Sequence, residues 1–194
     1  KAVFYGKRDL RVEEVKEPKP GPQEAKVRIN YCGICGSDLH EYVHGLFPQS
    51  RFGHEACGEI VELGSEVVGF QLGERVLALD KGGYAEYTLC PQQQMVKIPE
   101  GMSWERAATV EPLAAAAYAI DRGGLKPGDT VLITGAGPIG LMLLIGVKAI
   151  GVSEVYITDT SETRSKKAEE LGASGAFNPA EVKISFASIR TEVA

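Results

Sequence analysis

Residues 130–140 read Thr-Val-Leu-Ile-Thr-Gly-Ala-Gly-Pro-Ile-Gly, and this stretch decides the fold of the second part of the chain. Thr130 to Thr134 form a largely apolar run of the kind found in the buried strands of parallel sheets. A helix is expected from about Pro138 to Ile150, a second strand from Glu154 to Thr158, and a second helix from Glu162 to Leu171. The order strand, helix, strand, helix predicts an α/β protein with a doubly wound parallel sheet.

The glycines of this stretch have the spacing G-x-G-x-x-G, which is typical of loops that bind a dinucleotide. Gly135 permits a tight turn, Gly137 lets the backbone approach a pyrophosphate, and Gly140 lets the helix pack closely on the strand. We expect the cofactor to contact Gly135, Gly137, Pro138, Ile139 and Gly140. The alternative is that the glycines only turn the chain.

Asp159 ends the second expected strand, close to the spacing of the carboxylate that binds the adenosine ribose in such folds. A carboxylate there accepts hydrogen bonds from the ribose hydroxyls and repels a 2′-phosphate, which favours NAD over NADP. Arg164 leaves a smaller opening for NADP. The alternative is that Asp159 is an ordinary residue at a strand end.

The first part of the chain has a different pattern. Val27, Ile29 and Tyr31 alternate with polar residues, as in a half-buried strand, and glycine and proline mark frequent turns. Many short strands predict a β-barrel-like domain. One or two helices are expected between Ser103 and Ile120. We place the domain boundary at residue 125, giving domains 1–125 and 126–194.

Composition argues against several classes of protein. The formal net charge of −5 gives no electrostatic reason to expect nucleic acid or an anionic membrane as a partner. The longest apolar stretch, Ile139 to Ile150, is too short and too interrupted to span a bilayer. The chain starts at Lys1 without a signal-like leader, so we expect a cytoplasmic protein. Four cysteines are too few and too scattered for a disulfide framework in a chain of 194 residues.

Candidate zinc ligands lie in two short motifs. One is Gly33-Ile34-Cys35-Gly36-Ser37-Asp38-Leu39-His40, and the other is Gly53-His54-Glu55. Thiolate, imidazole and carboxylate groups are all competent zinc ligands, and a catalytic zinc needs three of them and an open position. A single cysteine or histidine is more often a packing residue, so the spacing alone leaves both interpretations open.

Taken together, the motifs resemble the zinc-dependent medium-chain dehydrogenase/reductase family. Six motifs occur in the family's order: Gly33 to His40, Gly53-His54-Glu55, Gly73-Glu74-Arg75-Val76, Gly83-Tyr84-Ala85-Glu86-Tyr87, Val110-Glu111-Pro112-Leu113 and Gly135 to Gly140. The resemblance covers nearly all of residues 1–180. It is closest to the polyol, butanediol and threonine dehydrogenase branch, because Glu111 stands where classical alcohol dehydrogenases have cysteine. It implies a GroES-like catalytic domain followed by a Rossmann-type domain.

The resemblance also implies roles for the residues around the metal. Cys35 and His54 match the catalytic zinc ligands of the family. The third ligand matches either Glu55 or Glu111, directly or through water. Asp38 matches a carboxylate that orients the zinc-bound histidine.

The remaining roles concern the reaction. Ser37 and His40 match a relay that carries the alcohol proton through the nicotinamide ribose to solvent, whereas Cys32 matches no ligand. The resemblance therefore implies a dehydrogenase that uses catalytic Zn²⁺ and NAD on a small-molecule alcohol or ketone. Secondary alcohols, diols, sugar alcohols and threonine all stay open as substrates. A homo-oligomer, dimer or tetramer, is expected if the chain is complete.

Two departures from the family leave the extent of the chain open. Only Asp80-Lys81-Gly82 stands where the branch usually carries a four-cysteine lobe, so no structural zinc is assigned. The cofactor domain stops after about two and a half strand–helix units, and Lys183 to Ala194 match nothing in it. We expect a longer protein that lacks segments here, near Asp80 to Gly82 and near Ala180 to Ile184. The alternative is a true truncation.

Two other functions are weighed against the zinc enzyme. One is a zinc-free NAD(P)H quinone or enone reductase, which the joint presence of the ligand and relay residues and of Asp159 disfavours. The other is a non-catalytic remnant that binds a nucleotide or a partner protein, for which truncation is the only support.

Overall fold

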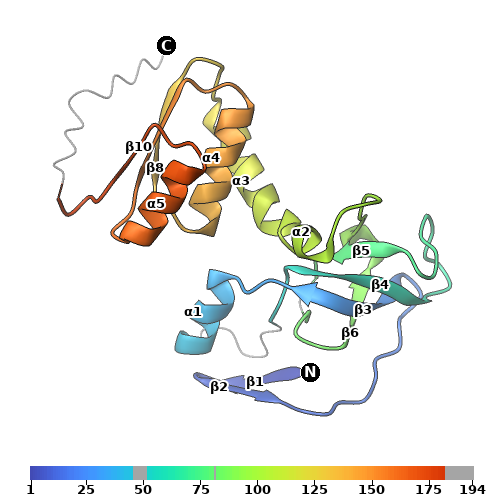
Figure 1. Ribbon diagram of the computed structural model, residues 1–194. Coiled ribbons are helices and arrows are strands. Elements are labelled where there is room, and N and C mark those ends of the chain that lie inside the picture. The colour runs from blue at the N-terminus through green and yellow to red at the C-terminus, as the bar shows by residue number, and fades with distance from the viewer. Residues whose placement is uncertain (46–51, 81, 182–194) are drawn as a thin grey trace. The chain divides into compact units, whose positions relative to one another are not determined.

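The computed structural model describes residues 1–45, 52–80 and 82–181 (Figure 1). The chain divides into two compact units, Lys1–Glu111 and Pro112–Ala194. The division falls within helix α3 (Val110–Gly123), whereas the sequence placed the boundary at residue 125. Lys81 lies outside the described residues. So does the tail Lys183 to Ala194, which matched no part of the cofactor domain in the sequence analysis.

The first unit is built on antiparallel strands. Its elements are β1 (Ala2–Gly6), β2 (Asp9–Val12), β3 (Glu24–Cys32), α1 (Gly36–His44), β4 (Ala56–Leu63), β5 (Arg75–Ala78), β6 (Tyr87–Pro91), a 3-10 helix (Gln92–Gln94), β7 (Met95–Lys97) and α2 (Trp104–Ala108). Five strands form one sheet in the order β6-β3-β4-β5-β7, and β1 pairs with β2 separately. The prediction of many short strands is confirmed, as is that of helices after Ser103.

This unit has two buried clusters, on opposite faces of the five-stranded sheet, and the larger one lies on the face that Val27 shares. Val27 on β3, Ile60 on β4 and Val76 on β5 are fully buried together. The predicted alternation on β3 fails at Tyr31, which is 45% exposed. The reason is a register shift between Ile29 and Tyr31 in the pairing with β4, because a bulge changes the face on which the following side chains lie.

The second unit contains a parallel sheet with helices packed on it. Its elements besides α3 are β8 (Thr130–Thr134), α4 (Pro138–Ala149), β9 (Glu154–Thr158), α5 (Glu162–Glu170) and β10 (Gly175–Phe177). The strand order is β10-β9-β8, with both pairings parallel. The two predicted strands have the predicted bounds, and the two predicted helices agree within one residue, so this part of the prediction is confirmed.

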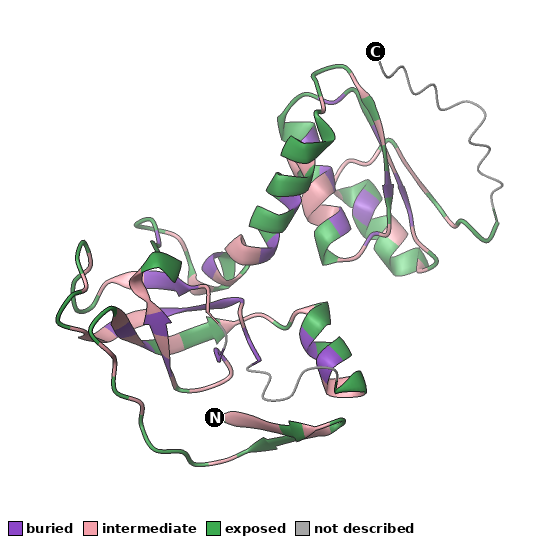
Figure 2. Ribbon diagram, turned by 180° about the vertical axis from the view of Figure 1, so that it is seen from behind, coloured by how far each residue is buried: buried purple, intermediate pink, exposed green. Residues whose placement is uncertain are grey.

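Apolar residues from α4 and the strands form the core of the second unit. Leu144 and Val147 on α4 pack against Ile133, Val155 and Ile157 of the sheet. Figure 2 shows buried residues on the strands and on the helices of each unit. Within the described residues β8 has a strand partner on one side only.

That free edge of β8 borders an exposed apolar surface. Leu132 on β8 is 38% exposed. The strand also contributes to a hollow that α3 and α4 line together. An unpaired strand edge beside apolar surface is a liability that folded proteins usually cover.

The loop between β8 and α4 depends on two of its glycines. Gly135 has φ +94°, a conformation that L side chains rarely adopt. A Cβ at position 140 would overlap the carbonyl oxygen of Gly135, so the helix can start this close to the strand only with glycine there. Position 137 has no such limit, because a Cβ there would meet no atom within 4 Å.

We therefore predict that Gly140→Ala destabilises the second unit by about 1–3 kcal/mol, the usual cost of forcing an extra group into a filled space. Gly137→Ala is the matched control and should change stability by less than about 0.5 kcal/mol. Scanning calorimetry of both variants without nucleotide measures the effect. Equal stability of the two variants would contradict the packing argument.

Candidate metal centre and dinucleotide-binding loop

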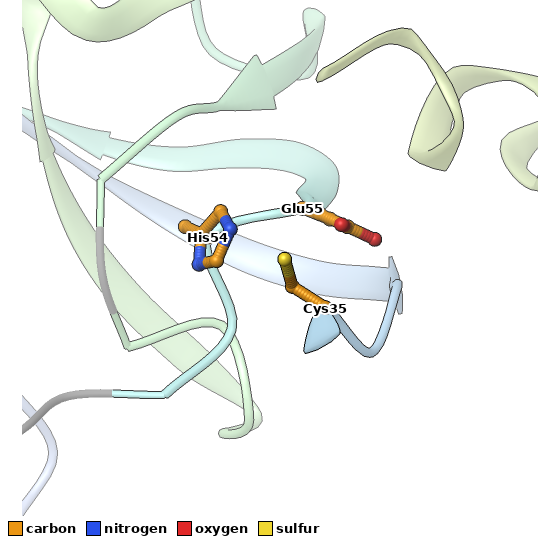
Figure 3. A group of neighbouring side chains, drawn as sticks. All are labelled: Cys35, His54 and Glu55. Atoms are coloured by element: carbon orange, nitrogen blue, oxygen red, sulfur yellow. The ribbon is translucent and has the colours of Figure 1, made fainter. Parts of the chain in front are cut away.

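The side chains of Cys35, His54 and Glu55 converge in the first unit (Figure 3). One thiol sulfur, one imidazole nitrogen and one carboxylate oxygen all lie within 4.8 Å of one another. Glu55 is buried, and the other two side chains are half-buried. This donor set matches the ligands that zinc prefers.

Cys35 is positioned by the start of α1. It is the residue before the helix, with an extended backbone (φ −78°, ψ 150°). Its carbonyl oxygen accepts a hydrogen bond from the Asp38 N–H at 3.1 Å, and its own N–H donates to Asp38 Oδ2 at 3.3 Å. The first turn of the helix therefore fixes where the thiol stands.

His54 and Glu55 are positioned by the loop that precedes β4. The Glu55 carbonyl oxygen accepts from Gly33 N–H, and the Gly53 carbonyl oxygen accepts from Gly83 N–H, both at 2.9 Å. A Cβ at position 33 would overlap the Glu55 carboxylate. Glycine at 33 thus leaves the room that the Glu55 side chain occupies.

Asp38 lies beside the candidate histidine ligand. It is buried at 8% exposure, and its Oδ1 is 3.9 Å from Nδ1 of His54. The same oxygen accepts a hydrogen bond from Gly53 N–H at 3.4 Å. The carboxylate is therefore close enough to influence the imidazole, although its role in orienting a ligand stays a prediction.

The two candidate third ligands differ in position. Glu55 belongs to the convergent group and Glu111 does not. Burial raises the pKa of Glu55, and the charge of Glu111 raises it further, whereas His54 and the Cys35 thiol lower it. Glu55 is therefore a member of the convergent group, whereas the negative charge of Glu111 raises the pKa of Glu55.

The two predicted relay residues lie on α1. Ser37 and His40 are both exposed, and neither belongs to the convergent group. The His40 ring stacks on that of His44, one helical turn later, with centroids 5.5 Å apart. The relay role stays a prediction.

Cys32, three residues before Cys35, is a free thiol outside the convergent group. Burial, followed by the charges of Asp38 and Glu55, raises the pKa of the Cys32 thiol to about 12. The thiol is therefore protonated at neutral pH and is unsuited to thiolate chemistry. This agrees with the resemblance, in which Cys32 matches no zinc ligand.

The second unit brings the glycine-rich loop and Asp159 together. Asp159 Oδ2 accepts from the Ala136 N–H at 2.9 Å, and Oδ1 accepts from the Ser161 N–H at 2.8 Å. These two hydrogen bonds, that of Ser161 first, lower the pKa of Asp159. Nη1 of Arg164 is 3.8 Å from Oδ2, so the guanidinium is close to this carboxylate.

The start of α4 offers a surface for an anion. Gly137 caps the helix without a side chain, and Pro138 is its first residue. Ile139 is 43% exposed. The free N–H groups and the positive end of the helix dipole are the usual partners of a pyrophosphate.

Comparison with known proteins decides the family. Residues 21–100 match the family model described as "Alcohol dehydrogenase GroES-like domain". The (R,R)-butanediol dehydrogenase of Bacillus subtilis (strain 168) is 36% identical over 211 residues, which cover 89% of this chain and 61% of that protein. Residues 21–100 therefore belong to the alcohol dehydrogenase GroES-like domain family, and the chain as a whole is similar to zinc-dependent medium-chain dehydrogenases/reductases.

Solved structures of the family agree. The crystal structure of 2R,3R-butanediol dehydrogenase from Bacillus subtilis has a TM-score of 0.87 at 34% identity, and the match covers 96% of this chain and 65% of that one. A protein described as a zinc-binding dehydrogenase from Sinorhizobium meliloti 1021, bound to NADP, has a TM-score of 0.88 at 31% identity, covering 99% and 65%. The predicted fold, a GroES-like domain followed by a Rossmann-type domain, is confirmed.

The chain covers only part of the length of its relatives. The chain spans 61% of the length of the curated butanediol dehydrogenase that it matches. Among the described residues, no helix has both the length and the apolar character needed to cross a membrane.

The environment of Asp159 predicts how stability depends on pH. The pKa of Asp159 is lowered in the fold, whereas an aspartate in the unfolded chain has a pKa of about 3.9. The ionised carboxylate therefore stabilises the fold above that value, and the contribution is lost as pH falls through the folded pKa. Asp159→Asn should be less stable than the unchanged chain at pH 7, and the difference should shrink below about pH 4.

Urea unfolding followed by circular dichroism between pH 3 and 7 measures this difference. Asp121→Asn, which makes the same substitution at an exposed position of α3, is the matched control. A stability difference for Asp159→Asn that stays constant over this range would contradict the prediction.

Proposed function

We propose that this chain is part of an oxidoreductase that uses catalytic zinc and NAD(H) to interconvert an alcohol and a ketone. The observation that supports this most strongly is the convergence of Cys35, His54 and Glu55, with all three ligand atoms within 4.8 Å of one another. Family membership and the glycine-rich loop beside Asp159 support the same conclusion.

The donor set fits zinc. Cys35 as a thiolate, His54 as a neutral imidazole and the Glu55 carboxylate would hold the ion and leave one position for a substrate oxygen. Glu111 is the alternative third ligand. When bound, zinc would polarise the substrate hydroxyl as a Lewis acid, and NAD would supply the hydride acceptor.

The side chains around the site would handle orientation and the proton. Asp38, 3.9 Å from Nδ1 of His54, would keep the imidazole in one orientation. Ser37 and His40 would take the hydroxyl proton of the alcohol and pass it to water, as their exposed positions on α1 allow. A histidine suits this step because its pKa lies near neutrality.

Asp159 supports NAD as the cofactor. Its oxygens are fixed by the N–H groups of Ala136 and Ser161, and each keeps acceptor capacity for a ribose hydroxyl. Its negative charge would oppose a 2′-phosphate. NADP is the alternative cofactor, because the exposed Arg164 lies nearby and the Sinorhizobium meliloti protein binds NADP. Binding of NAD(H) should therefore be compared with binding of NADP(H).

The proposed substrate class is a small secondary alcohol, diol, sugar alcohol or threonine, with the matching ketone. Similarity to the Bacillus subtilis butanediol dehydrogenase makes vicinal diols the first substrates to assay. Glu111, in the Val110-Glu111-Pro112 motif, supports the same branch of the family.

The metal hypothesis predicts that Cys35→Ala and His54→Ala each abolish zinc-dependent turnover and lower zinc affinity by at least about tenfold, while circular dichroism stays unchanged. Cys32→Ala is the matched control, because that thiol lies outside the convergent group. Zinc content by atomic emission and NAD-dependent oxidation of butane-2,3-diol are the measurements. Near-normal zinc content and activity in Cys35→Ala would refute the proposed metal centre. Activity that persists in a chain freed of zinc would favour the zinc-free reductase.

The cofactor hypothesis predicts tighter binding of NADH than of NADPH. Asp159→Ala should weaken NADH binding by about tenfold, which is the loss of about 1.4 kcal/mol, and should leave NADPH binding unchanged or tighter. Fluorescence titration of both nucleotides, with Asp121→Ala as control, measures the change. A chain that binds NADPH more tightly before any substitution would overturn the assignment of NAD.

A further inference from the structure

Tyr84 contacts the carboxylate that lies beside the metal centre. Its hydroxyl donates to Asp38 Oδ2 at 2.7 Å and lies 3.2 Å from the Gly33 carbonyl oxygen. A hydroxyl has a single proton, and the shorter distance and the carboxylate's charge favour the bond to Asp38. Tyr84 is thus hydrogen bonded to a group that itself stands beside a candidate ligand.

Asp38 connects the two segments that carry the candidate ligands. On one side, Oδ2 accepts from the Cys35 N–H at 3.3 Å. On the other, Oδ1 accepts from the Gly53 N–H at 3.4 Å and lies 3.9 Å from Nδ1 of His54. Both backbone bonds are long, whereas the bond from Tyr84 is short, so the tyrosine restrains this carboxylate most tightly.

The tyrosine is itself held in place. Its ring stacks on Phe52 with centroids 6.4 Å apart, and its carbonyl oxygen accepts from the Ala2 N–H at 2.8 Å. The preceding Gly83 N–H donates to the Gly53 carbonyl oxygen, so the tyrosine and the histidine loop are joined through the backbone as well. A Cβ at position 53 would overlap Tyr84, so the two segments approach each other closely.

We infer that Tyr84 is a positioning residue of the metal centre, which holds Asp38 so that Oδ1 faces Nδ1 of His54 and the other ring nitrogen is left for the metal. This inference rests on the proposed zinc site. It assigns a function to the tyrosine of the Gly83-Tyr84-Ala85 motif, which the proposed mechanism leaves without one. A histidine whose second nitrogen faces a fixed carboxylate keeps one tautomer and one ring orientation.

The test is Tyr84→Phe in the full chain, which removes the hydroxyl and keeps the ring. Zinc affinity, measured by competition with a chelator, should fall by about tenfold or more, the usual effect of losing a group that supports a ligand. With Co²⁺ as the probe metal, the visible absorption bands at saturation should shift, because they report the geometry of the ligands. Tyr5→Phe is the matched control, since it removes a hydroxyl that donates to Glu13 Oε2 at 2.9 Å on the exposed surface.

A purely structural role is separated from a positioning role in two ways. Bands recorded at saturation report the folded, metal-bound protein, so a loss of stability alone does not move them. In addition, the effect of Tyr84→Phe on zinc affinity should largely vanish in an Asp38→Asn background, because the tyrosine acts through that carboxylate.

Three results would overturn the inference. Unchanged affinity and Co²⁺ bands in Tyr84→Phe would show that the hydroxyl does not act on the centre. An equal loss of affinity with and without the Asp38 carboxylate would show that the effect does not pass through it. A chain with neither substitution that binds no zinc or Co²⁺ would overturn the inference together with the proposed function, whereas the first two results leave the zinc site standing.

Discussion

The backbone around Gly53 and Glu55 is held between two other segments, and the candidate metal centre depends on this arrangement. The Gly53 carbonyl oxygen accepts from Gly83, and the Glu55 carbonyl oxygen accepts from Gly33, both at 2.9 Å. Side chains larger than hydrogen would overlap neighbouring atoms at positions 33, 53 and 83. The glycines therefore let three strand ends approach closely enough for His54 and Glu55 to meet a thiol from another part of the chain.

The same use of glycine recurs in the second unit with a different consequence. Gly140 allows α4 to begin against the Gly135 carbonyl oxygen, which brings the helix start close to the strand ends. Asp159, from the end of β9, then accepts the Ala136 N–H of the loop. In each unit, close contact between backbone segments positions the polar groups: those of the candidate metal centre in the first unit, and Asp159 in the second.

The sequence predicted the features that depend on local pattern. The bounds of β8 and β9 followed from apolar runs, and the role of Gly135 followed from a tight turn and that of Gly140 from close packing of the helix. It failed where pairing between strands decides the outcome, as at Tyr31, because a bulge in β3 is set by its partner strand. The division between the compact units lies earlier than residue 125, and Ile120 of α3 packs against the core of the second unit, a contact that no local pattern predicts.

For the site residues too, the sequence does not predict contacts between segments that are far apart in the chain. Motifs supplied the candidates Cys35, His54 and Glu55, but spacing could not choose between Glu55 and Glu111, which only their positions in space distinguish. Tyr84 was visible in a motif, yet its bond to Asp38 spans a sequence separation of 46 residues. No local sequence pattern predicts a contact over this separation, so only the structure shows that the Tyr84 hydroxyl is bonded to Asp38.

X-ray absorption at the zinc edge of the metal-loaded chain tests the central claim most directly. One zinc held by Cys35, His54 and Glu55 predicts a single sulfur neighbour at about 2.3 Å, with nitrogen and oxygen neighbours at about 2.0–2.2 Å. The sulfur contribution should disappear in Cys35→Ala. A zinc environment without sulfur, or with two or more sulfur neighbours, would contradict the account.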